Sequence, residues 1–179
     1  MKANPRQQMG PLNPKYLTPF TFKPVVIPPE MCLIVDTREQ NSPLFLDKPP
    51  KGLMVMRDCL TAGDYGIRGL PNFSIERKYR GDLFSYCSTE MDTKTYKKME
   101  TFKQMIAAGG WVGLVIEEPM SNIYKWQEHT RISPECVRGA LSKFAIHYGV
   151  HVHFSGNREN ASRYILDMAV RYYNMVHEL

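Results

Sequence analysis

Short apolar runs that end in an acidic residue recur along this sequence. The run MCLIV at residues 31–35 leads directly into Asp36, and the run WVGLVIE at residues 111–117 ends in Glu117. Runs of this length, apolar at successive positions, are typical of strands that are buried on both faces. The sequence therefore predicts a sheet covered by helices, with charged residues at the ends of its strands.

Turn and capping residues indicate the remaining elements. Ser133 followed by Pro134 is typical of a helix start, because a hydroxyl caps the first turn and proline fits the first helical position. Further strands are predicted at 53–56, 65–68, 73–78 and 151–154, with the middle two forming a hairpin across 69–72. Further helices are predicted to start near Asp82, to span 93–108 before Gly109, to run from 133 to about 149, and to span 160–176. This order predicts an α/β fold with a central mixed β-sheet flanked by helices.

Residues 1–30 differ from the rest of the chain in composition. They contain a series of prolines among basic and polar residues: Pro5, Pro11, Pro14, Pro19, Pro24, Pro28 and Pro29. Proline lacks the amide donor that regular structure requires, so this segment is predicted to be an extended, basic N-terminal arm. The arm either contacts phosphate or lies solvated or draped over a partner. Residues 31–179 are predicted to form a single domain.

The net charge, the cysteines and the apolar runs indicate which kinds of partner and which compartment to expect for this protein. The net charge of +5 favours a polyanionic partner without establishing one. The four cysteines, Cys32, Cys59, Cys87 and Cys136, lie far apart, which predicts reduced core thiols rather than a zinc site or a disulfide framework. No apolar run approaches the roughly 20 residues of a membrane span. We therefore expect a soluble, intracellular protein, cytoplasmic or, in a eukaryote, nuclear.

Four polar clusters interrupt the apolar scaffold. They are Asp36-Thr37-Arg38-Glu39, Gly63-Asp64-Tyr65, Glu76-Arg77-Lys78, and Asp82. Each is predicted in a strand or at its end, where a charge facing the core costs several kcal/mol unless it is paired or bound to a metal. Each cluster taken alone has an ordinary explanation: a surface ion pair, a turn, a pair on an exposed strand, and a helix N-cap. Their combination favours a catalytic site.

Glu76 and Lys78 define the geometry of that site. Alternate side chains of a strand share one face, about 6.5 Å apart, so the carboxylate and the ammonium point the same way and Arg77 points the other way. If Asp64 on the neighbouring strand reaches Glu76, two carboxylates and a backbone carbonyl form the hard oxygen site that Mg²⁺ prefers. Lys78 would then orient a water or neutralise developing charge, and Arg38 would hold a phosphate with two hydrogen bonds.

These clusters resemble the nuclease domain of XPF-type structure-specific endonucleases. The matching segments are IVDTRE at 34–39, GDY at 63–65 and IERKYRGD at 75–82, and the similarity extends from about residue 31 to 177. The last motif is highly specific. The resemblance implies a restriction-endonuclease-like fold and metal-dependent cleavage of branched, flapped or forked DNA during repair, replication or recombination, with Mg²⁺ or Mn²⁺ as the cofactor.

The resemblance also implies roles for individual residues. Asp36, Asp64 and Glu76 resemble the acidic metal ligands, and Lys78 resembles the catalytic lysine. A supporting shell is implied at Arg38, Glu39, Arg77 and Asp82, where Arg77 braces the site from the opposite face.

Two departures from the family pattern bear on DNA binding. Relatives often append a tandem helix-hairpin-helix domain, and this sequence contains none, so junction recognition is expected from the nuclease surface, a second subunit or another protein. The helix at 93–108 lacks the arginine that is usual in relatives, and Lys94, Lys97 or Lys98 is expected to contact phosphate instead. In the segment 119–132, Lys125 and Arg131 are further candidate DNA contacts, although a loop that packs Trp126 is the favoured interpretation.

The last predicted helix carries an apolar stripe that bears on possible partners. The residues Tyr164, Ile165, Met168, Tyr172 and Met175 fall at helical spacing and form either core or a dimer surface. The resemblance implies a homodimer or heterodimer through the C-terminal helices. The first rival function is a non-catalytic, DNA-binding scaffold subunit, which is expected to have lost the acids or the lysine, and the second is a plain nucleic-acid-binding module.

Overall fold

The structure is a computed structural model that describes residues 25–40, 44–87, 93–128 and 130–178. Most of the predicted N-terminal arm, residues 1–24, lies outside this part of the chain. None of the helices in the described ranges combines the length and the apolar character that a membrane span requires.

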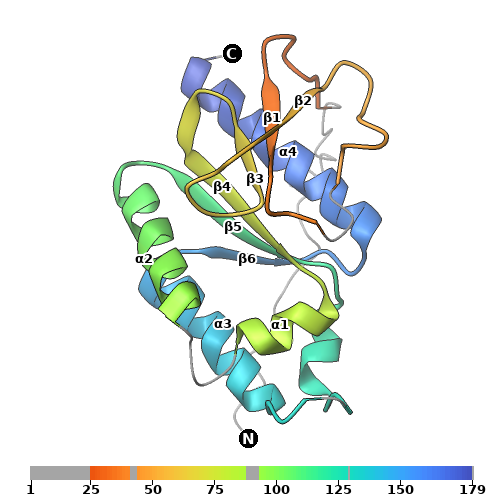
Figure 1. Ribbon diagram of the computed structural model, residues 1–179, viewed down its shortest axis with the longest axis vertical. Helices are drawn as coiled ribbons and strands as arrows, with labels where there is room; N and C mark the ends of the chain where they lie inside the picture. Colours follow the sequence, from red (N-terminus) through yellow and green to blue (C-terminus); the bar gives the residue numbers. More distant parts are fainter. Residues whose placement is uncertain (1–24, 41–43, 88–92, 129, 179) are drawn as a thin grey trace, which may run out of the picture.

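A mixed six-stranded sheet forms the centre of the molecule (Figure 1). Its order is β2 (Met54–Asp58), β1 (Cys32–Asp36), β3 (Tyr65–Ile67), β4 (Leu70–Lys78), β5 (Trp111–Ile116) and β6 (His151–Phe154). Strand β3 pairs antiparallel with both β1 and β4, and the other neighbours pair in parallel. Five strands therefore share one direction, and their carboxyl ends lie at one edge of the sheet. The predicted α/β fold with a central mixed sheet is confirmed.

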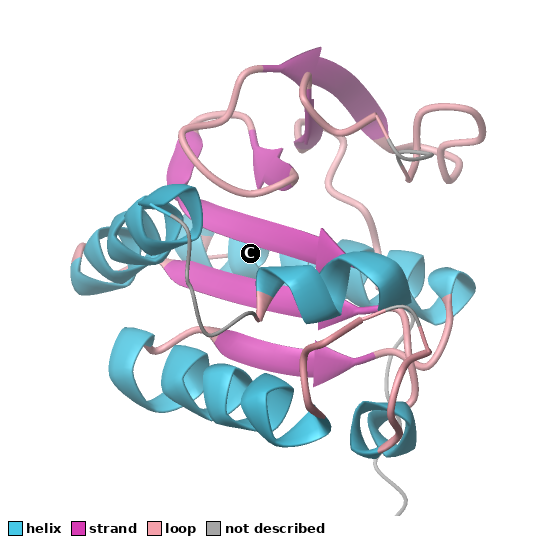
Figure 2. Cartoon of the chain, turned by 60° about the horizontal axis from the view of Figure 1, so that its bottom comes forward, coloured by secondary structure: helices cyan, strands magenta, loops and turns pink. Residues whose placement is uncertain are grey.

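Helices cover the sheet on both sides (Figure 2). They are α1 (Arg80–Tyr86), α2 (Thr93–Ala107), α3 (Pro134–Tyr148) and α4 (Arg158–His177), with a short 3-10 helix, η3 (Met120–Tyr124). Helix α4 packs on one face, and α1, α2 and α3 pack on the other, because each face has its own set of buried apolar residues. The two sets meet strand β5 from opposite sides, where Val115 belongs to one set and Leu114 to the other. This explains why β5 shows no polar alternation.

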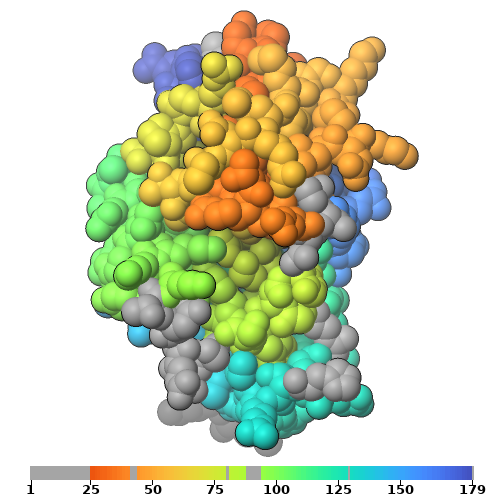
Figure 3. Space-filling model, in the orientation of Figure 1, coloured from red at the N-terminus to blue at the C-terminus, as the bar shows by residue number. Residues whose placement is uncertain are grey.

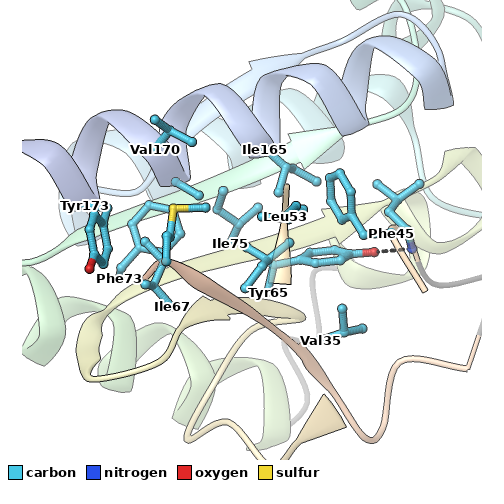
Figure 4. Packing of buried hydrophobic residues seen from close by; sticks show 14 of the residues in the cluster. Val35, Phe45, Leu53, Tyr65, Ile67, Phe73, Ile75, Ile165, Val170 and Tyr173 are labelled. Atoms are coloured by element: carbon cyan, nitrogen blue, oxygen red, sulfur yellow. Dashed lines mark hydrogen bonds between the residues drawn. The ribbon is translucent and has the colours of Figure 1, made fainter. Parts of the chain in front are cut away.

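The core beneath α4 is built from alternate residues of the central strands (Figure 4). Tyr65 and Ile75 are fully buried there against Ile165 of α4. The Leu44 amide donates a hydrogen bond to the Tyr65 hydroxyl over 2.9 Å. The predicted stripe on the last helix is mainly core, since Tyr164, Met168 and Tyr172 also pack against this cluster. Met175 is the exception, with 65% of its surface exposed.

Element boundaries follow the local signals where those signals are strong. Ser133 caps α3 by accepting a hydrogen bond from the Cys136 amide, and Gly149 ends that helix with φ 74°. The hairpin turn is tighter than predicted, because β4 already begins at Leu70. The expectation of four core thiols is wrong for Cys59, which is exposed.

Gly63 adopts a backbone conformation and a close approach that together exclude any side chain. Its φ is +88°, and a Cβ there would overlap Ser74 Oγ and lie 3.2 Å from the Ile75 carbonyl oxygen. Ser74 Oγ cannot easily move away, because it is buried and donates to the Ala62 carbonyl over 2.8 Å. Gly69 also has a positive φ, +81°, but it faces open space.

Alanine substitutions at Gly63 and Gly69 distinguish the cost of backbone strain from the cost of steric overlap. Gly63→Ala is expected to lower the free energy of unfolding by about 2–4 kcal/mol, from backbone strain plus overpacking. Gly69→Ala carries the strain alone and is expected to cost only about 1 kcal/mol. Urea unfolding followed by circular dichroism measures both values. Equal losses in the two variants would contradict the close packing between Gly63 and β4.

Candidate active site

The sheet brings three of the predicted acidic residues to one edge. Asp36 is the last residue of β1, Asp64 directly precedes β3, and Glu76 lies near the end of β4. Main-chain hydrogen bonds fix this arrangement: the Asp36 amide donates to the Asp64 carbonyl over 2.9 Å, and the Asp64 amide donates to the Ile75 carbonyl over 2.8 Å. Since β1 and β4 run parallel with β3 between them, residues far apart in sequence meet here. Figure 3 shows α1 and α2 on one face of the molecule, together with the exposed residues that follow β1.

Strand alternation places Glu76 and Lys78 on the face covered by α2. The Glu76 side chain has no solvent exposure and forms an ion pair with the Lys78 ammonium. Arg77 points to the opposite face, as the alternation predicts. Asp64 lies beside Glu76, and its Oδ2 accepts a hydrogen bond of 2.7 Å from the Arg77 amide. The structure thus brings Asp64, Glu76 and Lys78 together.

Lys98 also reaches this cluster. From helix α2 its ammonium contacts both oxygens of Glu76, at 2.8 Å and 2.9 Å. The Tyr86 ring lies beneath the two ammonium groups, with its centroid 4.8 Å from Lys78 Nζ and 5.9 Å from Lys98 Nζ. The sequence indicated Lys98 as a phosphate contact, whereas in this structure the residue neutralises a buried carboxylate.

The charges in this cluster shift one another's pKa values. Burial raises the pKa of Glu76, but the nearby ammonium groups of Lys78 and Lys98 outweigh burial and lower it. Burial and the negative charge of Glu76 raise the pKa of Asp64 to about 7. Burial acts to lower the pKa of Lys78, but Glu76 and Asp64 raise it above its usual value. Lys78 is therefore a cation at neutral pH, suited to stabilise negative charge rather than to accept a proton.

Asp36 lies on the same sheet face but has other partners. Its Oδ1 accepts hydrogen bonds from the backbone amide and Nε of Arg38, and its Oδ2 accepts from Arg38 Nη2 and the Leu60 amide. These four bonds use the whole acceptor capacity of a carboxylate. Burial raises the pKa of Asp36, but the hydrogen bonds from Arg38 and Leu60 prevail and lower it. Asp36 is thus engaged mainly by Arg38, whose side chain is 61% exposed.

The opposite face of β4 is braced by Arg77. Its guanidinium is 3% exposed and forms ion pairs with Glu39 at 3.1 Å and Glu117 at 2.9 Å. The predicted bracing role agrees with this geometry. Glu117 was not among the predicted site residues, although its position directly after a buried strand was a usable signal. Asp82 lies in the first turn of α1, and its charge contributes to the raised pKa of Lys78.

The donor atoms of the cluster suit a hard divalent cation. Glu76 and Asp64 supply carboxylate oxygens. The Arg77 carbonyl adds a third oxygen, because it accepts a hydrogen bond of 3.2 Å from Lys78 Nζ, the ammonium that also pairs with Glu76. Mg²⁺ needs only one or two carboxylates because it retains several waters. Within the described ranges, no group of three or more acidic, histidine or cysteine side chains converges as a metal site. The oxygen donors that lie together are thus two carboxylates and a carbonyl, while the Asp36 carboxylate is engaged by Arg38 and Leu60.

Other candidate DNA contacts lie on the surface. Lys94 and Lys97 are exposed on α2, and Lys125 and Arg131 are exposed in the segment that follows β5. Trp126 is 66% exposed, so the favoured interpretation that its loop packs the indole is wrong.

Comparisons with known proteins agree with this fold. The ERCC4 domain family model matches residues 35–168. The solved structure of XPF from Aeropyrum pernix is 17% identical, with a TM-score of 0.59 over 80% of this chain and 65% of that chain. XPF from Aeropyrum pernix in complex with DNA is 18% identical, with a TM-score of 0.58 and the same coverage. No curated protein matches this sequence significantly.

These likenesses confirm the restriction-endonuclease-like fold that the sequence predicted. This chain spans 65% of the length of the solved structures that it matches.

The raised pKa of Asp64 predicts a pH-dependent stability. The carboxyl titrates near 4 in the unfolded chain and at about 7 in the fold, so the native state loses stability as the pH rises from 4 to 7. In EDTA, Asp64→Asn is expected to be more stable than the wild type at pH 8 by on the order of 1 kcal/mol, with partial exposure of the site already allowed for. The difference should shrink toward pH 4.

Thermal unfolding at several pH values measures this difference. Asp47→Asn, which alters an exposed carboxylate, serves as the control and should show no such trend. A stability gain for Asp64→Asn that is the same at pH 4 and pH 8 would contradict the assigned burial of that charge.

Proposed function

This chain belongs to the ERCC4 domain family, and on that premise we propose that it is a divalent-metal-dependent DNA endonuclease. Its proposed substrates are branched, flapped or forked DNA, and its proposed cofactor is Mg²⁺ or Mn²⁺. The observation that carries the proposal is the fully buried Glu76 with Lys78 and Asp64 at one edge of the sheet. A buried carboxylate pair costs folding free energy, and a function that requires both acids would account for their proximity.

Each residue of the cluster has a defined task in this proposal. Glu76, Asp64 and the Arg77 carbonyl hold the divalent ion, which when bound polarises the scissile phosphate and acidifies a water. Lys78 stays protonated and stabilises the negative charge that develops on the phosphate oxygens. Tyr86 supports the ammonium from below through its ring.

Asp36 and Arg38 contribute in a second way. The Arg38 side chain is 61% exposed, so a DNA phosphate that approaches the edge of the sheet could compete with Asp36 and the Leu60 carbonyl for its guanidinium. Such competition would release an oxygen of Asp36 toward the metal. The predicted role of Asp36 as a ligand therefore depends on substrate binding.

DNA binding is proposed along the same edge. The net charge of +5 suits a phosphate backbone. Lys94 and Lys97 supply exposed positive charge on α2, the helix that carries Lys98, and Lys125 and Arg131 supply it in the segment after β5. One of the similar solved structures is an XPF in complex with DNA, which supports this assignment. A dimer through the C-terminal helices, with identical or different subunits, stays a prediction. Met175 and Val176 at the end of α4 are exposed and available for such a contact.

The rival function is a non-catalytic, DNA-binding scaffold subunit. Such a subunit has no need for Asp64, Glu76 and Lys78, yet all three are present, with Glu76 and Lys78 paired and Asp64 beside them. Metal-dependent cleavage distinguishes the two functions, because a scaffold binds DNA equally well in EDTA.

Cleavage of labelled branched, single-stranded and duplex DNA, with RNA included, tests the proposed activity. Cleavage is expected with Mg²⁺ or Mn²⁺ and not with EDTA. Lys78→Met is expected to reduce the rate by on the order of 1,000-fold, because it removes the cation that faces the developing charge. Glu76→Gln should abolish cleavage, because it removes a metal ligand.

Circular dichroism and DNA binding in EDTA show whether these variants remain folded. Lys103→Met, which removes an ammonium elsewhere on α2, is the matched control and should cut normally. Wild-type cleavage by folded Lys78→Met would overturn the assignment of Lys78, and no cleavage of any substrate by the wild type would favour the scaffold.

Trp126 provides a test for contact with unpaired bases. An exposed indole next to Lys125 in the sequence suits base stacking, which contributes about 1–3 kcal/mol per base. Titration with a single-stranded oligonucleotide is expected to quench tryptophan fluorescence, and Trp126→Leu should lose that quenching and bind about tenfold more weakly.

Two features make this readout specific. The second tryptophan, Trp111, is stacked between Phe73 and His151 and should not respond. Ile146→Ser alters an exposed apolar residue near the far end of α3 and should leave binding unchanged. Unchanged affinity in Trp126→Leu would remove this loop from the DNA surface.

A further inference from the structure

Glu76 is paired with two ammonium groups, although the proposed chemistry uses only that of Lys78. Lys98 contacts both carboxylate oxygens at nearly equal distances, 2.8 Å and 2.9 Å. This bridging position is one that a cation bound by both oxygens of the carboxylate would take. The family motif that includes Glu76 and Lys78 does not extend to Lys98, which lies on a separate helix.

We propose that Lys98 is a displaceable counter-ion that holds the cation position on Glu76 and gives way when a divalent metal binds. This inference rests on the proposed function, since it concerns the metal that the cleavage reaction requires. It assigns Lys98 as a positioning residue of the metal-free site, which acts through Glu76.

The charge balance of the cluster supports displacement. Two carboxylates, Asp64 and Glu76, face two ammonium groups, Lys78 and Lys98, so these four groups balance when both acids are ionised. Asp82 adds a further negative charge that acts on Lys78. A divalent ion added to these groups would leave an excess of positive charge in a partly buried site. Charges of one sign a few ångströms apart repel strongly where the effective dielectric constant is low. Departure of one lysine reduces this repulsion.

Lys98 can leave more readily than Lys78. The Lys98 side chain is 33% exposed, against 14% for Lys78. Lys78 is also held by the Arg77 carbonyl at 3.2 Å and by the closer contact with the Tyr86 ring. Lys98 reaches the site from a helix surface through a long flexible chain, so rotation of its side chain returns the ammonium to water at small cost.

Displacement would also give Lys98 a second position. Lys94 and Lys97 are exposed one turn away and adjacent on the same helix. A released Lys98 would add its charge to theirs, at the edge where the phosphate backbone is proposed to lie. The Lys98 ammonium would then pair with Glu76 before metal binds and with DNA phosphate after metal has bound.

Manganese binding in the absence of DNA tests the inference. Isothermal titration with Mn²⁺ compares the wild type with Lys98→Met and with Lys97→Met, which removes the same charge from the next residue. In the Lys98→Met variant Mn²⁺ has no ammonium to displace from Glu76. This variant is therefore expected to bind Mn²⁺ about tenfold more tightly than the wild type, equivalent to about 1.4 kcal/mol. Lys97→Met should bind like the wild type.

Thermal unfolding supplies a second readout. In EDTA, Lys98→Met is expected to melt below the wild type, because Glu76 loses one of its two partners. Saturating Mn²⁺ should remove that deficit, because the metal takes over the contact. Lys98→Arg, which keeps the charge, should stay close to the wild type in both measurements.

The outcomes separate this inference from the proposed function. Equal or weaker Mn²⁺ binding by Lys98→Met would overturn the inference and make Lys98 a fixed part of the site. If that result accompanies wild-type binding that Glu76→Gln abolishes, the metal site stands and only the role of Lys98 fails. If the wild type binds no Mn²⁺, the proposed metal dependence and the inference fall together.

Discussion

Burial of the Glu76 carboxylate imposes the condition that the surrounding elements must satisfy. A charged group without solvent contact is tolerated only where cations and hydrogen-bond donors surround it. Strand β4 supplies the Lys78 ammonium two residues away, helix α2 supplies the Lys98 ammonium, and α1 supplies the Tyr86 ring beneath both. The packing of α2 against the sheet, through Met99 and Phe102, is therefore also what neutralises the site. Stability and chemistry depend on the same contacts.

The two faces of β4 divide the charged residues by task. Glu76 and Lys78 face the helix α2 side, where the reaction is proposed to occur. Arg77 faces the other side, where Glu39 and Glu117 hold its guanidinium away from solvent. Three carboxyl ends, those of β1, β4 and β5, are tied together by this one arginine. The rigidity that the proposed metal site needs would thus come from ion pairs on the other face of the strand, in line with the general need for a supporting shell.

Much of this arrangement could be predicted from the sequence, because it depends on local periodicity. Alternation along a strand placed Glu76 and Lys78 on one side and Arg77 on the other, and the buried run before Asp36 located the correct sheet edge. The remainder depends on contacts that no local pattern specifies. Asp36 is held by Leu60, 24 residues away, and Lys98 meets Glu76 only because of how α2 docks. The exposure of Trp126 likewise results from tertiary packing, which propensity cannot supply.

The alternation on β4 also affects how the chain reaches its fold. A shift of the strand by a single residue would exchange its two faces, so that Arg77 would enter the acidic pocket and Glu76 and Lys78 would be pressed among the apolar residues beneath α4. Several buried ions would then lose their partners at once, at a cost of several kcal/mol each. Misaligned pairing between β3, β4 and β5 is thereby disfavoured by the cost of unpaired buried charges as well as by poor side-chain packing. The residues proposed to cut DNA also serve as a check on correct assembly of the sheet.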